Sequence, residues 1–176
     1  PDTSCAIIVD DVSVRHPDSP VDALTALSLK LAAGERVAVV GPSGAGKSTL
    51  MALIAGERHP HTGRVLTQPG AWLNQRPDLF QDSLRDNLRL ADPDADDAAL
   101  WQALEAAGLA DAIRRLQAGL DTRLGEGGLG LSAGQARRLA LARLLLQQRP
   151  LWLLDEPTEG LDAATATDVL ARLDTL

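Results

Sequence analysis

The fold is decided by the stretch Gly41-Pro42-Ser43-Gly44-Ala45-Gly46-Lys47-Ser48-Thr49. It matches the pattern G-x-x-x-x-G-K-[ST], in which glycines let the backbone curl until consecutive N–H groups face phosphate oxygens. A helix that starts inside the stretch adds the positive end of its dipole. A chance match is rarer than usual because Lys30 and Lys47 are the only lysines of the chain. The stretch therefore predicts a loop that binds the phosphates of a nucleotide.

Each side chain of this loop has an expected partner. Lys47 reaches the β and γ phosphates, and the Ser48 hydroxyl ligates Mg²⁺. Thr49 is placed to contact the α phosphate. ATP and Mg²⁺ are therefore the predicted ligands. The loop residues expected to bind them are Gly41, Ser43, Gly44, Ala45, Gly46, Lys47, Ser48 and Thr49.

The residues around the loop predict a strand before it and a helix after it. Arg36-Val37-Ala38-Val39-Val40 is short, β-branched and apolar, as a fully buried parallel strand is. A helix is expected from Lys47 to about Ala55. Other short strands are expected at residues 7–14, as an edge strand, and at 27–31, 65–66 and 71–74.

A helical pattern occupies the middle of the chain. Asp96 and Asp97 stand where an N-cap and a first helical turn favour negative charge, and Gly108 ends that helix. Ser132 is expected to cap a long helix, and a last helix starts near Ala163. Strands and helices at both ends with helices between them predict an α/β fold with an inserted helical part.

A second half of a nucleotide site follows in Leu151-Trp152-Leu153-Leu154-Asp155-Glu156. An apolar strand that ends in acids, expected to be a second buried strand, places carboxylates at the carboxyl edge of a sheet, beside the phosphate loop. Asp155 can hold Mg²⁺, directly or through water. Glu156 can polarise an attacking water. The pattern is weak alone and becomes specific in combination with the phosphate loop.

Three further motifs make the chain resemble the nucleotide-binding domain of ABC transporters. Leu131-Ser132-Ala133-Gly134-Gln135 resembles the signature L-S-G-G-Q, Glu159-Gly160-Leu161-Asp162 resembles the D-loop, and Gln75 stands at the Q-loop glutamine. The resemblance implies a RecA-like P-loop NTPase core with an N-terminal antiparallel β subdomain and an inserted helical subdomain. Residues 1–78 and 136–176 would form the core of this single domain, with its C-terminal part incomplete, and 79–135 would form the helical subdomain.

The resemblance also implies a mechanism that needs a second such domain. Two domains would pack head to tail, with ATP between one phosphate loop and the signature of the other. Glu156, Gln75 and Lys47 would carry catalysis, and Ser48, Gln75 and Asp155 would hold Mg²⁺. The signature and D-loop residues expected to contact the partner's nucleotide are Ser132, Gly134, Gln135 and Asp162. His16 stands where many relatives have a tyrosine that stacks on adenine; an ordinary loop histidine is the alternative.

Exporters within this family are the nearest match. Thr122-Arg123-Leu124-Gly125-Glu126-Gly127-Gly128 resembles their X-loop, in which Glu126 and the Gln75 loop would meet a transmembrane domain outside this chain; Arg123 departs from the usual acid. Residues 125–128 with 155–162 are similar to the CydC-type subunit of thiol exporters, whereas Gln135-Ala136 favours the CydD type. The resemblance implies cysteine or glutathione export, a role in cytochrome bd assembly, and a place at the cytoplasmic face of the bacterial inner membrane.

Composition argues against other classes. The net charge is −7 and the pI about 4.9, so no nucleic-acid partner is expected, and the arginine pairs at 114–115 and 137–138 are interpreted as solvated helix faces. No apolar run reaches the length of about 18 residues that a membrane span needs. Two alternatives stay open: a soluble ABC ATPase of DNA repair, chromosome maintenance or translation, and a regulatory module without turnover.

Two departures from the family pattern bear on activity. The interval from Lys47 to Gln75 is shorter than in most relatives. No histidine follows Glu156, where the family carries its switch histidine, so we expect weak hydrolysis by this chain as it stands.

Overall fold

A computed structural model describes residues 5–17, 19–75 and 78–176. These residues fall into two compact units, which are described separately. The strand unit comprises the chain up to Trp72 together with Arg149–Asp155, and the helical unit comprises Leu73–Gln148 and Glu156–Leu176. The phosphate loop and Asp155 therefore belong to the strand unit, whereas the signature and Glu156 belong to the helical unit.

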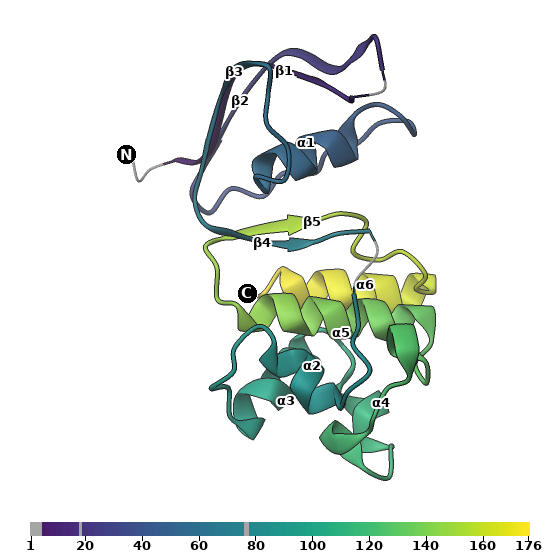
Figure 1. Ribbon diagram of the computed structural model, residues 1–176. Helices are drawn as coiled ribbons and strands as arrows, with labels where there is room; N and C mark the ends of the chain where they lie inside the picture. Colours follow the sequence, from purple (N-terminus) through teal and green to yellow (C-terminus); the bar gives the residue numbers. More distant parts are fainter. Residues whose placement is uncertain (1–4, 18, 76–77) are drawn as a thin grey trace. The chain divides into compact units, whose positions relative to one another are not determined.

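The strand unit contains an antiparallel sheet of β1 (Cys5–Arg15), β2 (Asp22–Ala32) and β3 (Thr62–Thr67), in the order β2-β1-β3 (Figure 1). The prediction of an edge strand at 7–14 is wrong, because β1 is the central strand. Val9 lies opposite Leu29 of β2 and Val65 of β3. An alternating pattern reports which face is buried and not how many neighbours a strand has.

A second, two-stranded sheet pairs β4 (Gly70–Leu73) with β5 (Leu151–Leu154). In β5 only Leu153 is buried and the other three residues are half-buried, so the expected full burial of this strand is not found. The helix α1 (Lys47–Ile54) shares one hydrophobic cluster with β1 and β5, and Leu53, Val9 and Leu153 are members of it. This common core holds α1, which begins in the phosphate loop, and β5, which leads to Asp155.

The predicted buried strand at 36–40 is a further correction. These residues form no strand, and the exposed fractions are 49% for Val37, 44% for Val39 and 87% for Val40. None of the described strands pairs with them. Apolar, β-branched composition favours burial between two strands, but a ladder forms only where neighbours supply its hydrogen bonds.

The helical unit is built from α2 (Leu84–Arg89), α3 (Asp97–Ala106), α4 (Ala110–Arg114), α5 (Ala133–Leu146) and α6 (Ala163–Leu173). Short 3₁₀ turns occupy Gly119–Asp121 and Glu126–Gly128. The core is aliphatic, as the aromatic content of 2% requires. Its most buried side chains include Leu84, Leu88, Leu100, Leu104, Leu139, Leu141 and Val169.

The predicted helix starts are confirmed by side-chain caps. Asp96 accepts a hydrogen bond from the backbone N–H of Ala99 at 2.8 Å, and Asp162 accepts one from Thr165 at 2.9 Å. Each cap satisfies an N–H group of a first helical turn that has no partner inside the helix. Among the described helices, none combines the length and the apolar character that crossing a bilayer requires.

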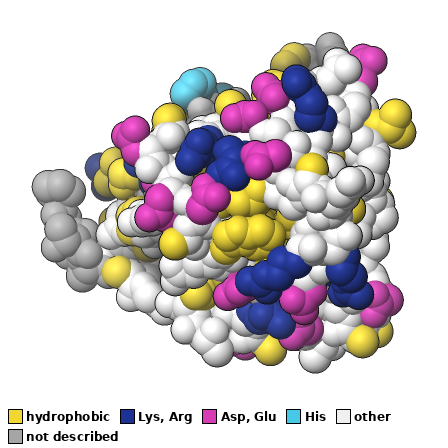
Figure 2. Space-filling view, turned by 90° about the horizontal axis from the view of Figure 1, so that it is seen from below, with side chains coloured by type: hydrophobic (Ala, Val, Ile, Leu, Met, Phe, Trp, Pro, Cys, Tyr) yellow, Lys and Arg dark blue, Asp and Glu magenta, His cyan; other side chains and the backbone are white. Residues whose placement is uncertain are grey.

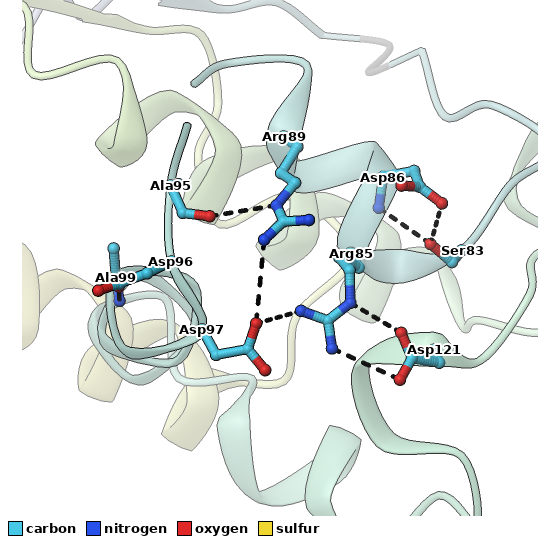
Figure 3. A network of polar contacts seen from close by, with 9 residues as sticks. All are labelled: Ser83, Arg85, Asp86, Arg89, Ala95, Asp96, Asp97, Ala99 and Asp121. Atoms are coloured by element: carbon cyan, nitrogen blue, oxygen red, sulfur yellow. Dashed lines mark hydrogen bonds and ion pairs between the residues drawn. The ribbon is translucent and has the colours of Figure 1, made fainter. Parts of the chain in front are cut away.

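An ionic network joins three elements of the helical unit (Figure 3). Arg85 of α2 donates to Asp121 at 2.7 Å and also to Asp97 at the start of α3, while Arg89 donates to the carbonyl of Ala95 at 3.1 Å. The hydrogen bond from Arg85 lowers the pKa of the Asp121 carboxyl, and the same pairing raises the pKa of Arg85. Figure 2 shows that basic side chains lie among acidic ones on the face it draws, with an apolar area at its centre.

Candidate nucleotide-binding site

The phosphate loop of the strand unit has a backbone that only glycine accommodates well. Gly44 and Gly46 have positive φ values of 79° and 88°. A Cβ atom at Gly46 would lie 2.7 Å from the carbonyl oxygen of Ala23 and 2.9 Å from Leu24, so the loop and β2 approach each other where a side chain would stand. The position thus excludes other residues both by conformation and by contact.

The helix after the loop leaves its first amides open to a ligand. Gly46 is the N-cap of α1 and supplies no side-chain cap. Such N–H groups, with the helix dipole behind them, form a site for anions. The Lys47 ammonium donates to the carbonyls of Gly41 at 2.9 Å and Pro42 at 2.8 Å. Its charge therefore lies over the loop, where a phosphate chain would be bound.

His16 and Thr49 contact each other at the edge of this loop. The His16 Nε2 and the Thr49 hydroxyl are 3.2 Å apart, with Thr49 buried and His16 half-buried. The structure thus brings the predicted adenine residue to the first turn of α1. The Thr49 hydroxyl is engaged by this contact, while its predicted role at the α phosphate stays a prediction.

The predicted magnesium ligands offer oxygen atoms, which this ion prefers. Ser48 is exposed on α1, and Asp155 is half-buried directly after β5. The helix and the strand share the core described above. A hydroxyl and a carboxylate from these two elements suit a hard cation; Gln75, the third predicted ligand, belongs to the helical unit.

The signature segment forms a capping box at the start of α5. The Ser132 hydroxyl accepts from the Gln135 N–H at 3.2 Å, and the Gln135 side chain accepts from the Ser132 N–H at 2.9 Å. A Cβ at Gly134 would lie 2.8 Å from Leu161 and 3.0 Å from the carbonyl of Gly160, so the D-loop packs on the signature. Asp162 caps α6 immediately after that contact.

The predicted catalytic positions of the helical unit are both accessible. The side chains of Gln75 and Glu156 are exposed, and Glu156 has a left-handed φ of 50°. Arg76 and Pro77 of the expected Q-loop lie outside the described residues. One buried arginine, Arg137, contacts the backbone of both predicted catalytic residues. Its guanidinium donates to the carbonyls of Gln75 at 3.0 Å and Glu156 at 2.8 Å.

The interpretation of 137–138 as a solvated face is wrong for Arg137, whose exposed fraction is 3%. A signal for this was present in the sequence. Gly134, Arg137, Leu141 and Leu144 recur at helical spacing and are all buried on α5. An arginine inside that apolar face needed polar partners, and backbone carbonyls provide them.

Residues 122–124 of the X-loop segment lie beside residues 82–84 in the helical unit. The N–H of Leu84 donates to Thr122 O at 3.0 Å, and the N–H of Leu124 donates to Asp82 O at 2.9 Å. Arg123, the departure from the exporter pattern, lies 3.7 Å from the Asp82 carboxylate. Glu126 is exposed in the turn that follows.

Comparison with known proteins agrees with this geometry. The family model described as "ABC transporter" matches residues 24–159. The chain is 43% identical to the glutathione/L-cysteine transport system ATP-binding/permease protein CydC of Escherichia coli K12, over 96% of the chain and 31% of that protein. It is 40% identical to the mycobactin import ATP-binding/permease protein IrtB of Mycobacterium tuberculosis H37Rv, over 92% of the chain and 31% of the relative.

A solved structure also matches. A bacterial Atm1-family ABC exporter with ATP bound superimposes with a TM-score of 0.91 at 36% identity, over 97% of this chain and 32% of that one. The chain thus spans about a third of the length of the proteins it matches. The similarity confirms the predicted P-loop fold with its antiparallel β and helical parts.

Proposed function

This chain belongs to the ABC transporter family, and we propose that it is the ATP-binding and ATP-hydrolysing domain of a bacterial exporter. The observation that carries the proposal is the phosphate loop. Gly46 admits no side chain, α1 leaves its first amides without a side-chain cap, and Lys47 lies over the loop. These features together favour a polyphosphate ligand.

Hydrolysis is assigned to named groups of this chain. Lys47 and the loop amides bind and orient the β and γ phosphates of ATP, and Glu156 accepts a proton from the attacking water. Ser48, Asp155 and Gln75 would hold Mg²⁺. When bound, this ion neutralises charge on the phosphate oxygens. His16 lies against α1 and is assigned to the adenine side of the site.

A second domain of the same kind completes the site. Ser132, the Gly134 backbone, Gln135 and Asp162 are assigned to the nucleotide held by the partner's phosphate loop. Support comes from the place of these residues at the N-terminus of α5, a helix of 14 residues, where Ser132 is exposed and the positive end of the helix dipole favours a phosphate. The partner is either a second copy or a related chain.

Coupling to a transmembrane partner is assigned to Glu126 and the Gln75 loop. Support comes from the turn that carries Glu126, which packs on the stretch just after Gln75, since a Cβ at Gly128 would lie 2.8 Å from the Leu79 side chain. We place the domain at the cytoplasmic face of the bacterial inner membrane. The permease segments named in the relatives' descriptions fit such a partner.

Cysteine or glutathione is the proposed cargo, with a role in cytochrome bd assembly. The CydC relative supports it, since its description names glutathione and L-cysteine. Transport of the cargo by vesicles that contain the full-length protein tests this assignment. Uptake of radiolabelled glutathione into inside-out vesicles should require ATP, and ATP-dependent transport of a siderophore instead would overturn it.

The ATPase proposal is tested with Glu156→Gln in the full-length protein. Without the carboxylate base, bound ATP persists, so radiolabelled ATP should remain with a dimeric species through gel filtration, with the mass measured by light scattering. Lys47→Ala is the control that should retain no ATP. A Glu156→Gln protein that stays monomeric at saturating ATP would contradict the dimer mechanism.

A further inference from the structure

Arg137 is the one charged residue classed as buried in the described part of the chain. Its exposed fraction is 3%, and it lies in the second turn of α5, the helix that begins at the signature Ser132. Burial of an ionic group is costly unless hydrogen bonds replace water. The acceptors of the Arg137 guanidinium therefore indicate which segments of the chain this residue holds in place.

Arg137 has acceptors among the backbone carbonyls of two separate segments. One terminal nitrogen of Arg137 donates to the carbonyls of Asn74 at 2.5 Å and Gln75 at 3.0 Å. The other terminal nitrogen donates to the carbonyl of Glu156 at 2.8 Å. The planar fork of a guanidinium bridges two such segments with fixed geometry, which the single point charge of a lysine cannot do.

The Glu156 backbone is a strained position that needs such support. Its φ of 50° lies in the left-handed region, where a residue with a side chain is held only by its surroundings. The Glu156 carbonyl accepts from Arg137 and from the N–H of Glu159 at 3.0 Å. These two donors fix the peptide that follows the residue assigned as the base.

We propose that Arg137 is a positioning residue for hydrolysis, which clamps the Gln75 and Glu156 backbones in one fixed relation. The inference rests on the proposed function, because it takes Gln75 and Glu156 as the groups that act on ATP and water. The inference adds a contact between the Q-loop and the residue after Walker B, made through Arg137, which is not part of either motif. The same helix carries the signature at its first turn and the clamp in its second.

Arg138, the next residue of α5, provides a matched control. Its side chain also donates to backbone carbonyls, those of Gly108 at 2.7 Å and Gly134 at 3.3 Å. It contacts neither Gln75 nor Glu156 by any described hydrogen bond. Replacement of Arg138 therefore removes a similar arginine from the same helix without touching the proposed clamp.

The test is steady-state ATP hydrolysis by the full-length protein carrying Arg137→Met, Arg137→Lys or Arg138→Met. For Arg137→Met we expect kcat to fall about 10- to 100-fold, because small displacements of catalytic groups cost up to that factor. KM should change less than about threefold, because the clamp holds groups that act on the γ phosphate and water. Arg137→Lys should be intermediate, and Arg138→Met should keep kcat while lowering the Tm.

Two results would overturn the proposal. One is an Arg137→Met or Arg137→Lys protein whose kcat stays within about twofold of the wild type. The other is a loss of kcat matched by Arg138→Met, which would assign the effect to general destabilisation of α5. If Arg137→Met does not fold, Arg137→Lys decides alone. A wild-type protein without ATP turnover would instead contradict the proposed function.

Discussion

At the phosphate loop, Gly44 and Gly46 share a left-handed backbone but differ in what surrounds them. Nothing lies within 4 Å of a Cβ built on Gly44, whereas one on Gly46 would meet the Ala23 carbonyl at 2.7 Å. The first position requires glycine through φ alone. The second position requires glycine both because of its φ and because β2 approaches it closely. The P-loop motif fixes the glycine in the sequence but does not describe this contact with β2.

Gly46→Ala should therefore impair the protein more than Gly44→Ala. The left-handed conformation costs about 1–2 kcal/mol for a residue with a Cβ in either case. At Gly46 the clash with backbone atoms adds to it and displaces the N-terminus of α1. Thermal unfolding and the Kd for a fluorescent ATP analogue measure both effects. Equal losses for the two variants would show that the contact with β2 does not shape the loop.

At the residue scale, the environment of one arginine was misassigned from the sequence. Arg137 was expected in solvent and lies buried. Its hydrogen-bond acceptors Gln75 and Glu156 are 62 and 19 positions away in the sequence, so the local pattern does not reveal them. The contact of His16 with Thr49 also joins residues that are 33 positions apart, and the adenine role of His16 stays a prediction. Contacts over such separations depend on how the elements pack, and local composition does not encode them.

Among the elements, the helices followed their local signals most closely. Asp96, Ser132 and Asp162 were predicted as caps or as motif residues, and each caps its helix. Cap chemistry acts within three residues, so sequence alone is enough to locate it. Strands depend on partners. The segment 36–40 has strong strand composition and no ladder, and 7–14 has the right residues but a central place rather than an edge.

The cap at Ser132 leads to a prediction at this scale. Ser132→Ala should lower the free energy of unfolding by about 1 kcal/mol, as loss of a serine cap usually does. It should also weaken ATP-dependent association, because the same hydroxyl is assigned to the partner's nucleotide. Asp96→Ala removes an equivalent cap from α3 and should affect only stability. Denaturant unfolding and light scattering with ATP separate the two outcomes; unchanged association of Ser132→Ala would limit Ser132 to capping.

At the scale of the whole molecule, many basic and acidic side chains of the described residues form local pairs. The net charge is −7, and several arginines of the helical unit pair with neighbouring acids, as Arg85 does with Asp121 and Asp97 (Figure 3). Arg114 and Arg172 pair in the same way with Glu105 and Asp168. Exposed pairs of this kind are individually weak and are screened by salt.

The lowered pKa of Asp121 predicts part of the acid sensitivity of the protein. Because the folded pKa lies below the ordinary value of 3.8, ionised Asp121 stabilises the fold above that pH. The contribution is lost as the pH falls through the folded pKa. Asp121→Asn should therefore lower the Tm at about pH 6, and lower it by less at about pH 3, where the unfolded carboxyl is mostly protonated. A Tm difference of equal size at both values would exclude ionisation as the cause.

By itself the sequence determined the family, the phosphate loop, the acids after β5, the signature with its cap, and the helical character of the middle segment. These features lie in short stretches, where interactions between residues close in the sequence determine the local structure. Tertiary structure alone decided which strand is central, that 36–40 stays exposed, and that Arg137 joins Gln75 to Glu156. Those outcomes need partners from distant segments, and which segments meet depends on the packing of the complete fold.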